Sequence, residues 1–341
     1  MTKLNTPPGH IPIEGQTVLV TGGAGFLGRH LVELLLAQRD VRIRVLALPA
    51  ESVPGAWGQR VTVIRGDVTV REDVEAAALA CTTIFHLAAL VGDGASYAEH
   101  ERVTAGGTRQ VLAVAQATGA LVVLTTSICA YGQAIQHESC AEDTPKGRFQ
   151  GPYSRAKQLQ EAATWQFMAS KGRAVIVRPA NIIGPGCGPW LNDAAHALRQ
   201  GLPALIGGGR GHAALTVVDN VADFLLLVAQ RPEAVGRAYN VHDDLAVSWQ
   251  QYFQDLALLL GTRPPRSIPR WLAYAAAHAT EGLWRTWLPG RRPPVTREAL
   301  NLIAWDSRFP LDRAHGLGWR PRISYEQALA RMGEDIRKRG L

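Results

Sequence analysis

The stretch Thr21-Gly-Gly-Ala-Gly-Phe-Leu-Gly28 follows an apolar, β-branched run at residues 17–21 and leads into a helical pattern at residues 27–38. Its glycines, at positions 22, 25 and 28, allow a tight turn, a close approach of the backbone to a bound group, and close packing of the helix on the strand. The N-terminus of that helix presents free N–H groups and the positive end of its dipole. A strand, a glycine loop and a helix in this order predict a site for the pyrophosphate of a dinucleotide.

Similar short apolar runs alternate with helical patterns through the first half of the chain. The further extended runs are residues 42–46, 61–65, 83–87, 121–125 and 174–177. The further helical patterns, with apolar residues three and four apart, are residues 72–80, 97–118 and 153–170. This alternation predicts an α/β fold with a Rossmann-type, doubly wound parallel sheet, helices on both faces, and ligands at the carboxyl ends of the strands.

The alternating pattern loosens after residue 180. Gly184-Pro-Gly-Cys-Gly-Pro189 and Gly207-Gly-Gly-Arg-Gly211 interrupt it, and strand patterns return at the start of 216–228 and at 238–241. We therefore predict a dinucleotide-binding domain of residues 1–180 plus about 213–241. The predicted second domain, smaller and discontinuous, binds substrate and consists of residues 181–212 plus 242–341.

Composition excludes several classes of protein. Hydrophobic residues make up 47% of the 341-residue chain and charged residues 19%, as in ordinary globular proteins. No stretch is apolar for the length of a membrane span, and residues 1–16 do not have the pattern of a signal peptide. Cys81, Cys129, Cys140 and Cys187 form no CxxC pair and no spacing typical of a metal site. We expect reduced thiols in a cytoplasmic protein, and no metal.

The chain carries a formal net charge of +7, from 36 basic and 29 acidic residues. Basic and aromatic residues do not interleave as they do on a platform that stacks bases, so we expect no nucleic-acid partner. An anionic cofactor or a lipid surface would also fit a basic protein.

Tyr153 and Lys157, in Gly151-Pro-Tyr-Ser-Arg-Ala-Lys157, are four residues apart, which places both side chains on one face of a helix. A free phenol has a pKa of ~10 and is a poor base at neutral pH unless a nearby cation favours the phenolate. The spacing therefore indicates an activated tyrosine. The competing interpretation is a half-buried ring beside a solvated lysine.

The second extended run lacks the acidic residue that binds the adenosine ribose of NAD. Ala47 takes that place, no arginine follows it to hold the 2′-phosphate of NADP, and Arg44 lies before the strand end. We therefore predict NAD or NADP as the cofactor and leave the choice open. Asp67, at the end of the third run, is predicted to accept a hydrogen bond from the adenine amino group, with a helix N-cap as its competing role.

Further motifs support one family. After the glycine loop come Gly66-Asp67, His86-Leu-Ala-Ala89, Tyr153-x-x-x-Lys157 and Arg178-Pro179. With these motifs in this order, the chain resembles the extended short-chain dehydrogenase/reductase family, also called the NAD-dependent epimerase/dehydratase family, over nearly its whole length. The resemblance implies a nicotinamide-dependent enzyme with NAD or NADP.

The resemblance also implies roles for particular residues. Tyr153 would be the general acid/base, and Lys157 would bind the nicotinamide ribose and lower the pKa of the tyrosine. A Ser or Thr at the end of the fifth strand would complete the catalytic site, and alignment to Tyr131-Gly132 favours Ser127, with Thr126 as its neighbour. The implied cofactor-binding residues are Gly22, Gly25, Phe26, Leu27, Gly28, Asp67, Val68, Leu87, Ala88, Ala89, Tyr153, Lys157 and Pro179.

Three positions bear on the branch of the family. Thr104 stands where the family usually has asparagine and can still hydrogen-bond, but with a different reach, so the resemblance carries over neither the local helix geometry nor a proton relay at this position. Ile128-Cys129 replaces the Asp-Glu pair of nucleotide-sugar dehydratases, which argues against dehydration. Ala213 stands where nucleotide-sugar epimerases have a phosphate-binding arginine, so Arg210 would have to substitute, whereas Asn181 matches an epimerase feature.

The C-terminal part is similar to the 3β-hydroxysteroid dehydrogenase branch. Its motifs are Ile268-Pro-Arg-Trp271, Arg292-Pro-Pro-Val-Thr-Arg297, Phe309-Pro-Leu-Asp312 and Leu317-Gly-Trp-Arg-Pro321. The resemblance implies an NAD(P)-dependent oxidoreductase that interconverts a secondary alcohol and a ketone on a hydrophobic substrate such as a steroid, a terpenoid or an acyl/polyketide chain. Two alternatives stay open: a nucleotide-sugar 4-epimerase that uses the same catalytic residues, and a dinucleotide-binding protein without chemistry, which would be expected to have lost Tyr153 and Lys157.

The expected partner is thus a lipophilic small molecule, with Asn181 and Trp190 as candidate substrate residues. The tryptophan-rich segment 271–288, flanked by Arg270, Arg285, Arg291 and Arg292, has two interpretations. It is a lid or interfacial helix in peripheral contact with a membrane, or a core helix of the small domain. The resemblance also implies a homodimer.

Overall fold

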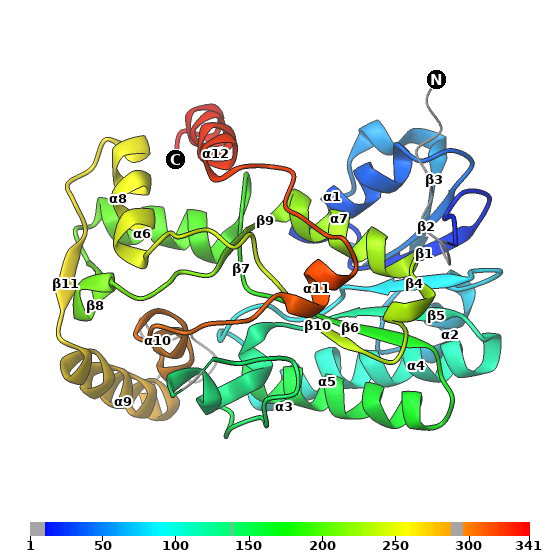
Figure 1. Ribbon diagram of the computed structural model, residues 1–341, viewed down its shortest axis with the longest axis horizontal. Helices are drawn as coiled ribbons and strands as arrows, with labels where there is room; N and C mark the ends of the chain where they lie inside the picture. The colour runs from blue at the N-terminus through cyan, green and yellow to red at the C-terminus, as the bar shows by residue number, and fades with distance from the viewer. Residues whose placement is uncertain (1–10, 138, 288–295) are drawn as a thin grey trace.

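The computed structural model describes residues 11–137, 139–287 and 296–341. Its main feature is a sheet of seven strands in the order β10-β6-β5-β4-β1-β2-β3 (Figure 1). The strands are β1 (Thr17–Thr21), β2 (Arg42–Ala47), β3 (Val61–Arg65), β4 (Thr83–His86), β5 (Leu121–Thr125), β6 (Ala174–Pro179) and β10 (Ala238–Val241). Every pair is parallel, so all the carboxyl ends lie at one edge. The predicted Rossmann-type fold is confirmed.

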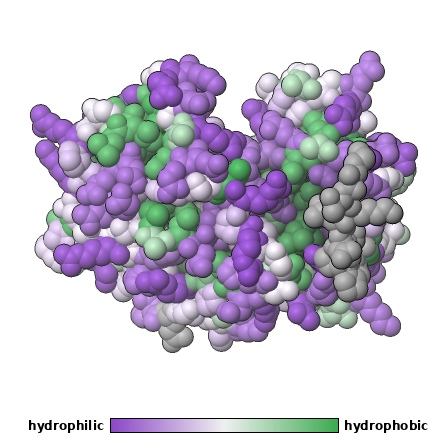
Figure 2. All heavy atoms as spheres, turned by 45° about the horizontal axis from the view of Figure 1, so that its top comes forward, coloured by the Kyte–Doolittle hydropathy of each residue, from purple (hydrophilic) through white to green (hydrophobic). Residues whose placement is uncertain are grey.

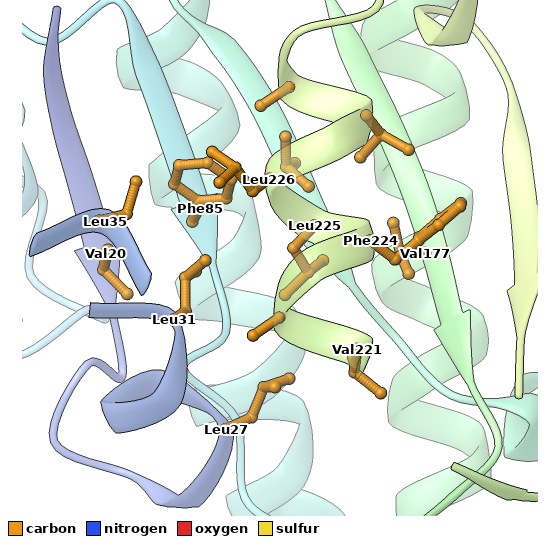
Figure 3. Close-up of a cluster of buried hydrophobic side chains, with 14 of the residues drawn as sticks. Val20, Leu27, Leu31, Leu35, Phe85, Val177, Val221, Phe224, Leu225 and Leu226 are labelled. Carbon is orange, nitrogen blue, oxygen red and sulfur yellow. The ribbon is translucent and has the colours of Figure 1, made fainter. Parts of the chain in front are cut away.

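Helices cover both faces of this sheet, as a fully parallel sheet requires. Helices α1 (Phe26–Leu36) and α7 (Val218–Ala229) lie on one face, and α2 (Arg71–Ala77), α4 (Gly107–Thr118) and α5 (Pro152–Ala169) on the other (Figure 1). Figure 3 shows Leu31 of α1 and Leu225 of α7 packed over Phe85 of β4. Because both faces are buried, the strands are apolar almost throughout.

The helical pattern predicted at 97–118 forms one continuous segment with an irregular middle. It consists of α3 (Tyr97–His100), the π-helical turn η2 (Glu101–Gly106) and α4. Thr104, the residue that departs from the family pattern, is buried in this π turn, and its hydroxyl accepts a hydrogen bond from the Leu90 N–H at 3.1 Å. Such turns are frequent at functional sites.

The remaining elements form a second body beside the sheet. Strands β7 (Asn181–Ile183) and β9 (Leu215–Val217) pair with each other, as do β8 (Pro203–Ile206) and β11 (Arg266–Ile268). Its helices are α6 (Ala194–Arg199), α8 (Trp249–Leu260), α9 (Arg270–Trp287), α10 (Arg297–Ile303) and α12 (Tyr325–Arg339). Helix α11 (Asp312–Gly316) instead packs against β10, and its Ala314 belongs to the core of the central sheet. Figure 2 shows a notch between the lobe that carries α8 and α12 and the lobe that carries α1.

The second body has its own core, in which Trp249, Tyr252 and Met332 are fully buried. The chain returns from it to the central sheet as β10 and leaves again. The domain limits given above remain a prediction. In the part of the chain that the structure describes, no helix is long and apolar enough to cross a membrane.

Candidate active site

Tyr153, Lys157 and Ser127 come together at the carboxyl edge of the sheet. Ser127 follows β5 and caps the 3-10 segment η3 (Ile128–Gln136), where its Oγ accepts a hydrogen bond from the Cys129 N–H at 3.1 Å. Tyr153 lies in the first turn of α5, and its phenol interacts with the Ser127 side chain. Lys157, one turn further along α5, has its Nζ 5.4 Å from the centroid of the Tyr153 ring.

Burial controls the protonation of this group. It raises the pKa of Tyr153 far above that of a free phenol, and the hydrogen bond with Ser127 offsets only part of that effect. Burial also lowers the pKa of Lys157 to about 8. Desolvation disfavours the charged form of each group. The phenol is therefore protonated at neutral pH, and the ammonium is close to its titration range.

A chain of buried, neutral side chains holds Lys157. Its Nζ donates to Gln160 Oε1 at 2.9 Å and to the Thr125 carbonyl at 3.4 Å. Gln160 Nε2 in turn donates to Thr108 Oγ1 at 2.7 Å. The lysine is thus fixed by its own helix, by the end of β5 and, through Gln160, by α4.

The same chain continues through His86 to the glycine loop. Thr108 Oγ1 donates to the Thr104 carbonyl at 2.8 Å, so it must accept from its other neighbour, His86 Nε2, at 2.9 Å. That places the ring hydrogen on Nε2 and leaves Nδ1 to accept from Thr21 Oγ1 at 2.7 Å. Burial lowers the pKa of His86 to about 3, so the ring stays neutral. His86 links the strand before the glycine loop to the support of Lys157.

Thr126, the neighbour of Ser127, belongs to a different cluster. Its hydroxyl donates to Glu161 Oε1 at 2.9 Å, and Arg178 pairs with both oxygens of that carboxylate, at 2.9 and 2.7 Å. Lys146 Nζ lies 2.7 Å from Glu161 Oε2. Burial alone would raise the pKa of Glu161, but these cations and hydrogen bonds hold it below its usual range. Of the two hydroxyls considered from the sequence, Ser127 contacts Tyr153 and Thr126 contacts Glu161.

The glycine loop fits a dinucleotide. A Cβ added to Gly22, whose φ is +69°, would lie 2.8 Å from the Ala88 backbone nitrogen, and one added to Gly28 would lie 2.1 Å from the Gly22 carbonyl. Helix α1 begins at Phe26, so Phe26, Leu27 and Gly28 form its first turn. Leu87 and Ala88 follow β4 beside the loop, because β1 and β4 are neighbours. The structure thus brings the predicted cofactor residues of β1, α1 and β4 together.

Near the expected adenosine site, the helix N-cap role considered for Asp67 is wrong. Asp67 does not cap a helix: the N-cap of α2 is Val70, and Asp67 Oδ1 accepts from the Thr69 N–H in the turn before it, at 2.8 Å. Its contact with adenine remains a prediction. Arg44 donates to carbonyls at the end of α2, at 2.7 and 2.8 Å, and so is already engaged away from the end of β2.

The two candidate substrate residues, Asn181 and Trp190, both make contacts within the protein that give them a structural role. The buried Asn181 donates its Nδ2 to the Ala213 carbonyl at 2.7 Å and thereby ties β7 to the segment before β9. Trp190 packs on Trp249 with ring centroids 4.7 Å apart, at the edge of the core of the second body. A role in substrate binding remains a prediction for both. Arg291 and Arg292 lie outside the described residues.

The sequence interpretation missed two residues beside Tyr153. His100 lies edge-on to the Tyr153 ring, with centroids 6.0 Å apart, and Glu298 accepts hydrogen bonds from the first turn of α5. Glu298 is 145 residues from Tyr153, and no spacing or motif indicated it. Among the residues described, no group of His, Cys, Asp or Glu is arranged to hold a metal ion.

Comparison with known proteins identifies the family of the chain. Residues 18–241 match the model of the NAD dependent epimerase/dehydratase family. The chain is 31% identical to a 4-hydroxy-2-methyl-3-oxo-4-farnesyl-3,4-dihydroquinoline-1-oxide ketoreductase of Stigmatella aurantiaca, over 91% of this chain and 93% of that protein. It is 30% identical to a 2-alkyl-3-oxoalkanoate reductase of Stenotrophomonas maltophilia, over 92% and 98% respectively.

Solved structures show the same fold. An epimerase from Methanothermobacter thermautotrophicus superposes with a TM-score of 0.75 at 21% identity, over 96% of this chain and 94% of that one. A UDP-glucose 4-epimerase from Thermotoga maritima gives a TM-score of 0.74 at 20% identity, over 95% and 100%. At this level of identity the likeness concerns the fold.

Proposed function

The chain belongs to the NAD dependent epimerase/dehydratase family, the extended short-chain dehydrogenases/reductases, and we propose that it interconverts a secondary alcohol and a ketone on a hydrophobic substrate, with NAD or NADP as the hydride carrier. The observation that carries the proposal is the contact of Tyr153 with Ser127, beside Lys157, at the edge where the glycine loop lies. The similar ketoreductase and oxoalkanoate reductase support a lipophilic ketone as the substrate.

The nicotinamide supplies the hydride, and the chain's own residues handle the proton. In reduction, the protonated Tyr153 phenol donates to the ketone oxygen while the Ser127 hydroxyl stabilises the charge that develops there. Lys157, held by Gln160, binds the nicotinamide ribose and stabilises the phenolate that remains. In oxidation, each transfer runs the other way. The raised pKa of Tyr153 keeps the phenol protonated at neutral pH, which is the form that can donate a proton.

A Tyr153→Phe variant tests the role of the phenol. Loss of the general acid should lower kcat by about 10²- to 10⁴-fold, while NADPH or NADH still binds, as followed by the fluorescence of the reduced nicotinamide. Turnover should be measured with lipophilic ketones such as 3-oxosteroids and 2-alkyl-3-oxo acids. Turnover within a few fold of wild type, with the cofactor still bound, would reject the assignment.

A nucleotide-sugar 4-epimerase is less well supported. The place of the phosphate-binding arginine is taken by Ala213, which is fully buried and accepts the Asn181 amide through its carbonyl. Asn181, the residue that matched an epimerase, therefore has a structural partner. A rise in melting temperature with a UDP-sugar, together with its epimerisation, would favour this alternative.

We also propose that α9 contacts a lipid surface. Trp271, Leu283 and Trp287 are exposed on it, whereas Ala273 and Ala277 are buried, so only one face packs into the second body. An apolar helix face of this kind suits an enzyme with a lipophilic substrate. Co-sedimentation with phosphatidylglycerol vesicles that is lost in Leu283→Lys would support it. A homodimer through the same face would instead show as a doubled mass in light scattering, also lost in that variant.

A cytoplasmic location is the remaining proposal. Cys81, Cys129 and Cys187 are free and buried, which fits a reducing compartment. Recovery of the protein in the cytosolic fraction after cell disruption at high salt, which releases peripheral proteins, would support it, and recovery with secreted proteins would contradict it.

A further inference from the structure

A carboxylate from the second body completes the catalytic helix. Glu298, in the first turn of α10, accepts the Ser154 N–H on Oε1 at 2.5 Å and the Tyr153 N–H on Oε2 at 3.2 Å. These donors belong to the first turn of α5, where helical N–H groups have no partner within the helix. The N-cap of α5 is Gly151, which has no side chain with which to cap it. Glu298 supplies the acceptors that the local sequence lacks.

The contact with Glu298 leaves no space for a side chain at Gly151. A Cβ added to it would lie 2.3 Å from Glu298 Oε2, so the carboxylate fills the space of a side chain at this position. The φ of Gly151 is −168°, extended backbone that any residue adopts. The requirement for glycine therefore comes from Glu298 and not from backbone strain.

Helix α10 holds Glu298 firmly. Asn301, one turn beyond Glu298, donates to the Gly132 carbonyl at 2.9 Å and accepts from Gln136 Nε2 at 2.7 Å, both in η3. At the start of the helix, the Thr296 hydroxyl caps α10 and donates to Asp93, which follows β4. Glu298 is buried, with 6% of its surface exposed. Helix α10 is therefore joined to η3 through Asn301 and to the first turn of α5, which carries Tyr153, through Glu298.

We propose that Glu298 is a positioning residue: it fixes the first turn of α5, and thus the place of the Tyr153 phenol relative to Ser127, so that the catalytic site is complete only when α10 is docked. The inference rests on the proposed function of Tyr153. Both carboxylate oxygens of Glu298 are engaged by backbone N–H groups of α5. A displacement of about 1 Å at a reacting group can cost up to about 10²-fold in rate, so the backbone contact is sufficient to control turnover.

The test compares Glu298→Gln with a matched control, Asp243→Asn. Asp243 is also a buried carboxylate from another segment, and it accepts the Val217 N–H at the start of α7, at 2.8 Å. In Glu298→Gln, one oxygen becomes an NH2 group that cannot accept from the backbone. We expect kcat to fall about 10- to 100-fold, with KM for the ketone and the affinity for NADPH within about threefold. Asp243→Asn should lower the melting temperature but keep kcat.

Amide hydrogen exchange gives a readout that needs no turnover. In the full-length protein, exchange at the start of α5 should rise at least about tenfold in Glu298→Gln and stay unchanged in Asp243→Asn. If wild-type protein reduces none of the ketones but exchange responds in this way, the proposed function fails while the contact stands. Unchanged kcat, or unchanged exchange, in folded Glu298→Gln would overturn the proposal.

Gly151→Ala provides a second route if Glu298→Gln does not fold. The added methyl group displaces the carboxylate without changing any charge, so the same fall in kcat and the same local rise in exchange are expected. Gly188→Ala is the matched control, because a Cβ there meets no atom within 4 Å. A Gly151→Ala protein with wild-type kcat would overturn the proposal as well.

Discussion

Two buried networks diverge from neighbouring residues of α5, and they differ in charge. Gln160 leads through Thr108 and His86 to the glycine loop by neutral groups, whereas Glu161 lies among Arg178, Lys146 and the Thr126 hydroxyl. The neutral network ends at Lys157, and among the described residues no carboxylate pairs directly with its ammonium group. The ionic network holds the sheet edge and η3 together. Lys157, which is proposed to bind the cofactor, is thus held by neutral hydrogen-bonding groups. The structural contact between α5 and β6 is instead made by the ion pair of Glu161 with Arg178.

Breaking the ionic network should give the largest of the expected effects, and the quantity that changes should be the free energy of unfolding. Glu161→Gln leaves the Arg178 guanidinium buried without its carboxylate, and removing one partner of a buried pair costs about 3–5 kcal/mol. Urea unfolding should show this loss, while kcat of the folded fraction stays near wild type. The matched control is Glu75→Gln, which breaks the exposed pair with Arg71 and should cost less than about 0.5 kcal/mol. A stable Glu161→Gln protein with low kcat would reverse the roles of the two networks.

The neighbouring hydroxyls of Thr126 and Ser127 sharpen the comparison. Ser127→Ala should lower kcat about 10²-fold, since it removes a donor to the substrate oxygen, and should cost about 1 kcal/mol of stability, since it also removes the N-cap of η3. Thr126→Val should leave kcat intact and cost about 1–3 kcal/mol, because Glu161 loses a buried hydrogen bond. Steady-state kinetics and urea unfolding of both variants decide the matter. The opposite assignment of effects would show that the structure misplaces the reactive hydroxyl.

Breaking the neutral network should have a smaller effect on turnover. Gln160→Leu removes the acceptor of Lys157 and should lower kcat by about tenfold, with cofactor affinity also reduced. Gln158→Leu is the control on the same helix, because Gln158 donates only to the carbonyls of Ala130 and Gly147. It should lose stability but keep its turnover. Equal kinetics for the two variants would refute a role for the neutral network.

The smallest effect concerns pH. Burial lowers the pKa of Lys157 from 10.5 to about 8, so between these values the unfolded chain binds a proton that the folded protein does not. The contribution of Lys157 to stability is therefore full above pH 10.5 and is lost as the pH falls through about 8. Relative to Lys157→Met, wild type should gain stability between pH 8 and pH 10. If the free energy of unfolding, measured in urea at each pH, changed with pH in the same way in both proteins, the lowered pKa of Lys157 would be contradicted.

The parts of the fold that the sequence predicts well are those governed by local patterns. The strand bounds at 17–21, 61–65, 121–125 and 238–241 match β1, β3, β5 and β10. Strands β1, β5 and β10 are buried on both faces and are therefore continuous apolar runs, whereas β3 is a partly exposed edge strand. The short strands β7, β8 and β11 were not predicted, since they have only three or four residues, and β8 and β11 are also partly exposed. Length and burial, more than residue type, decided which strands could be found.

The site divides in the same way. Tyr153 and Lys157 are readable because they share one helix face, and the glycine loop because it follows a strand. Alignment to Tyr131-Gly132 favoured Ser127 over Thr126, but the contact of Thr126 with Glu161 depends on how α5 lies against β5 and could not be predicted. Glu298 could not be predicted, because its partners are backbone N–H groups 144 and 145 residues away. Every residue except proline has a backbone N–H, so the type of the partner residue does not indicate a contact of this kind.

The space that Gly151 leaves for Glu298 constrains protein engineering. Substrate range in such enzymes could be changed by grafting a foreign C-terminal region onto this dinucleotide-binding half. A graft with glutamate at position 298 collides with any side chain at position 151, and a graft without it leaves the first turn of α5 uncapped. The two positions therefore have to be transplanted as a pair, and a chimera that separates them should fail at its junction even if each half is folded.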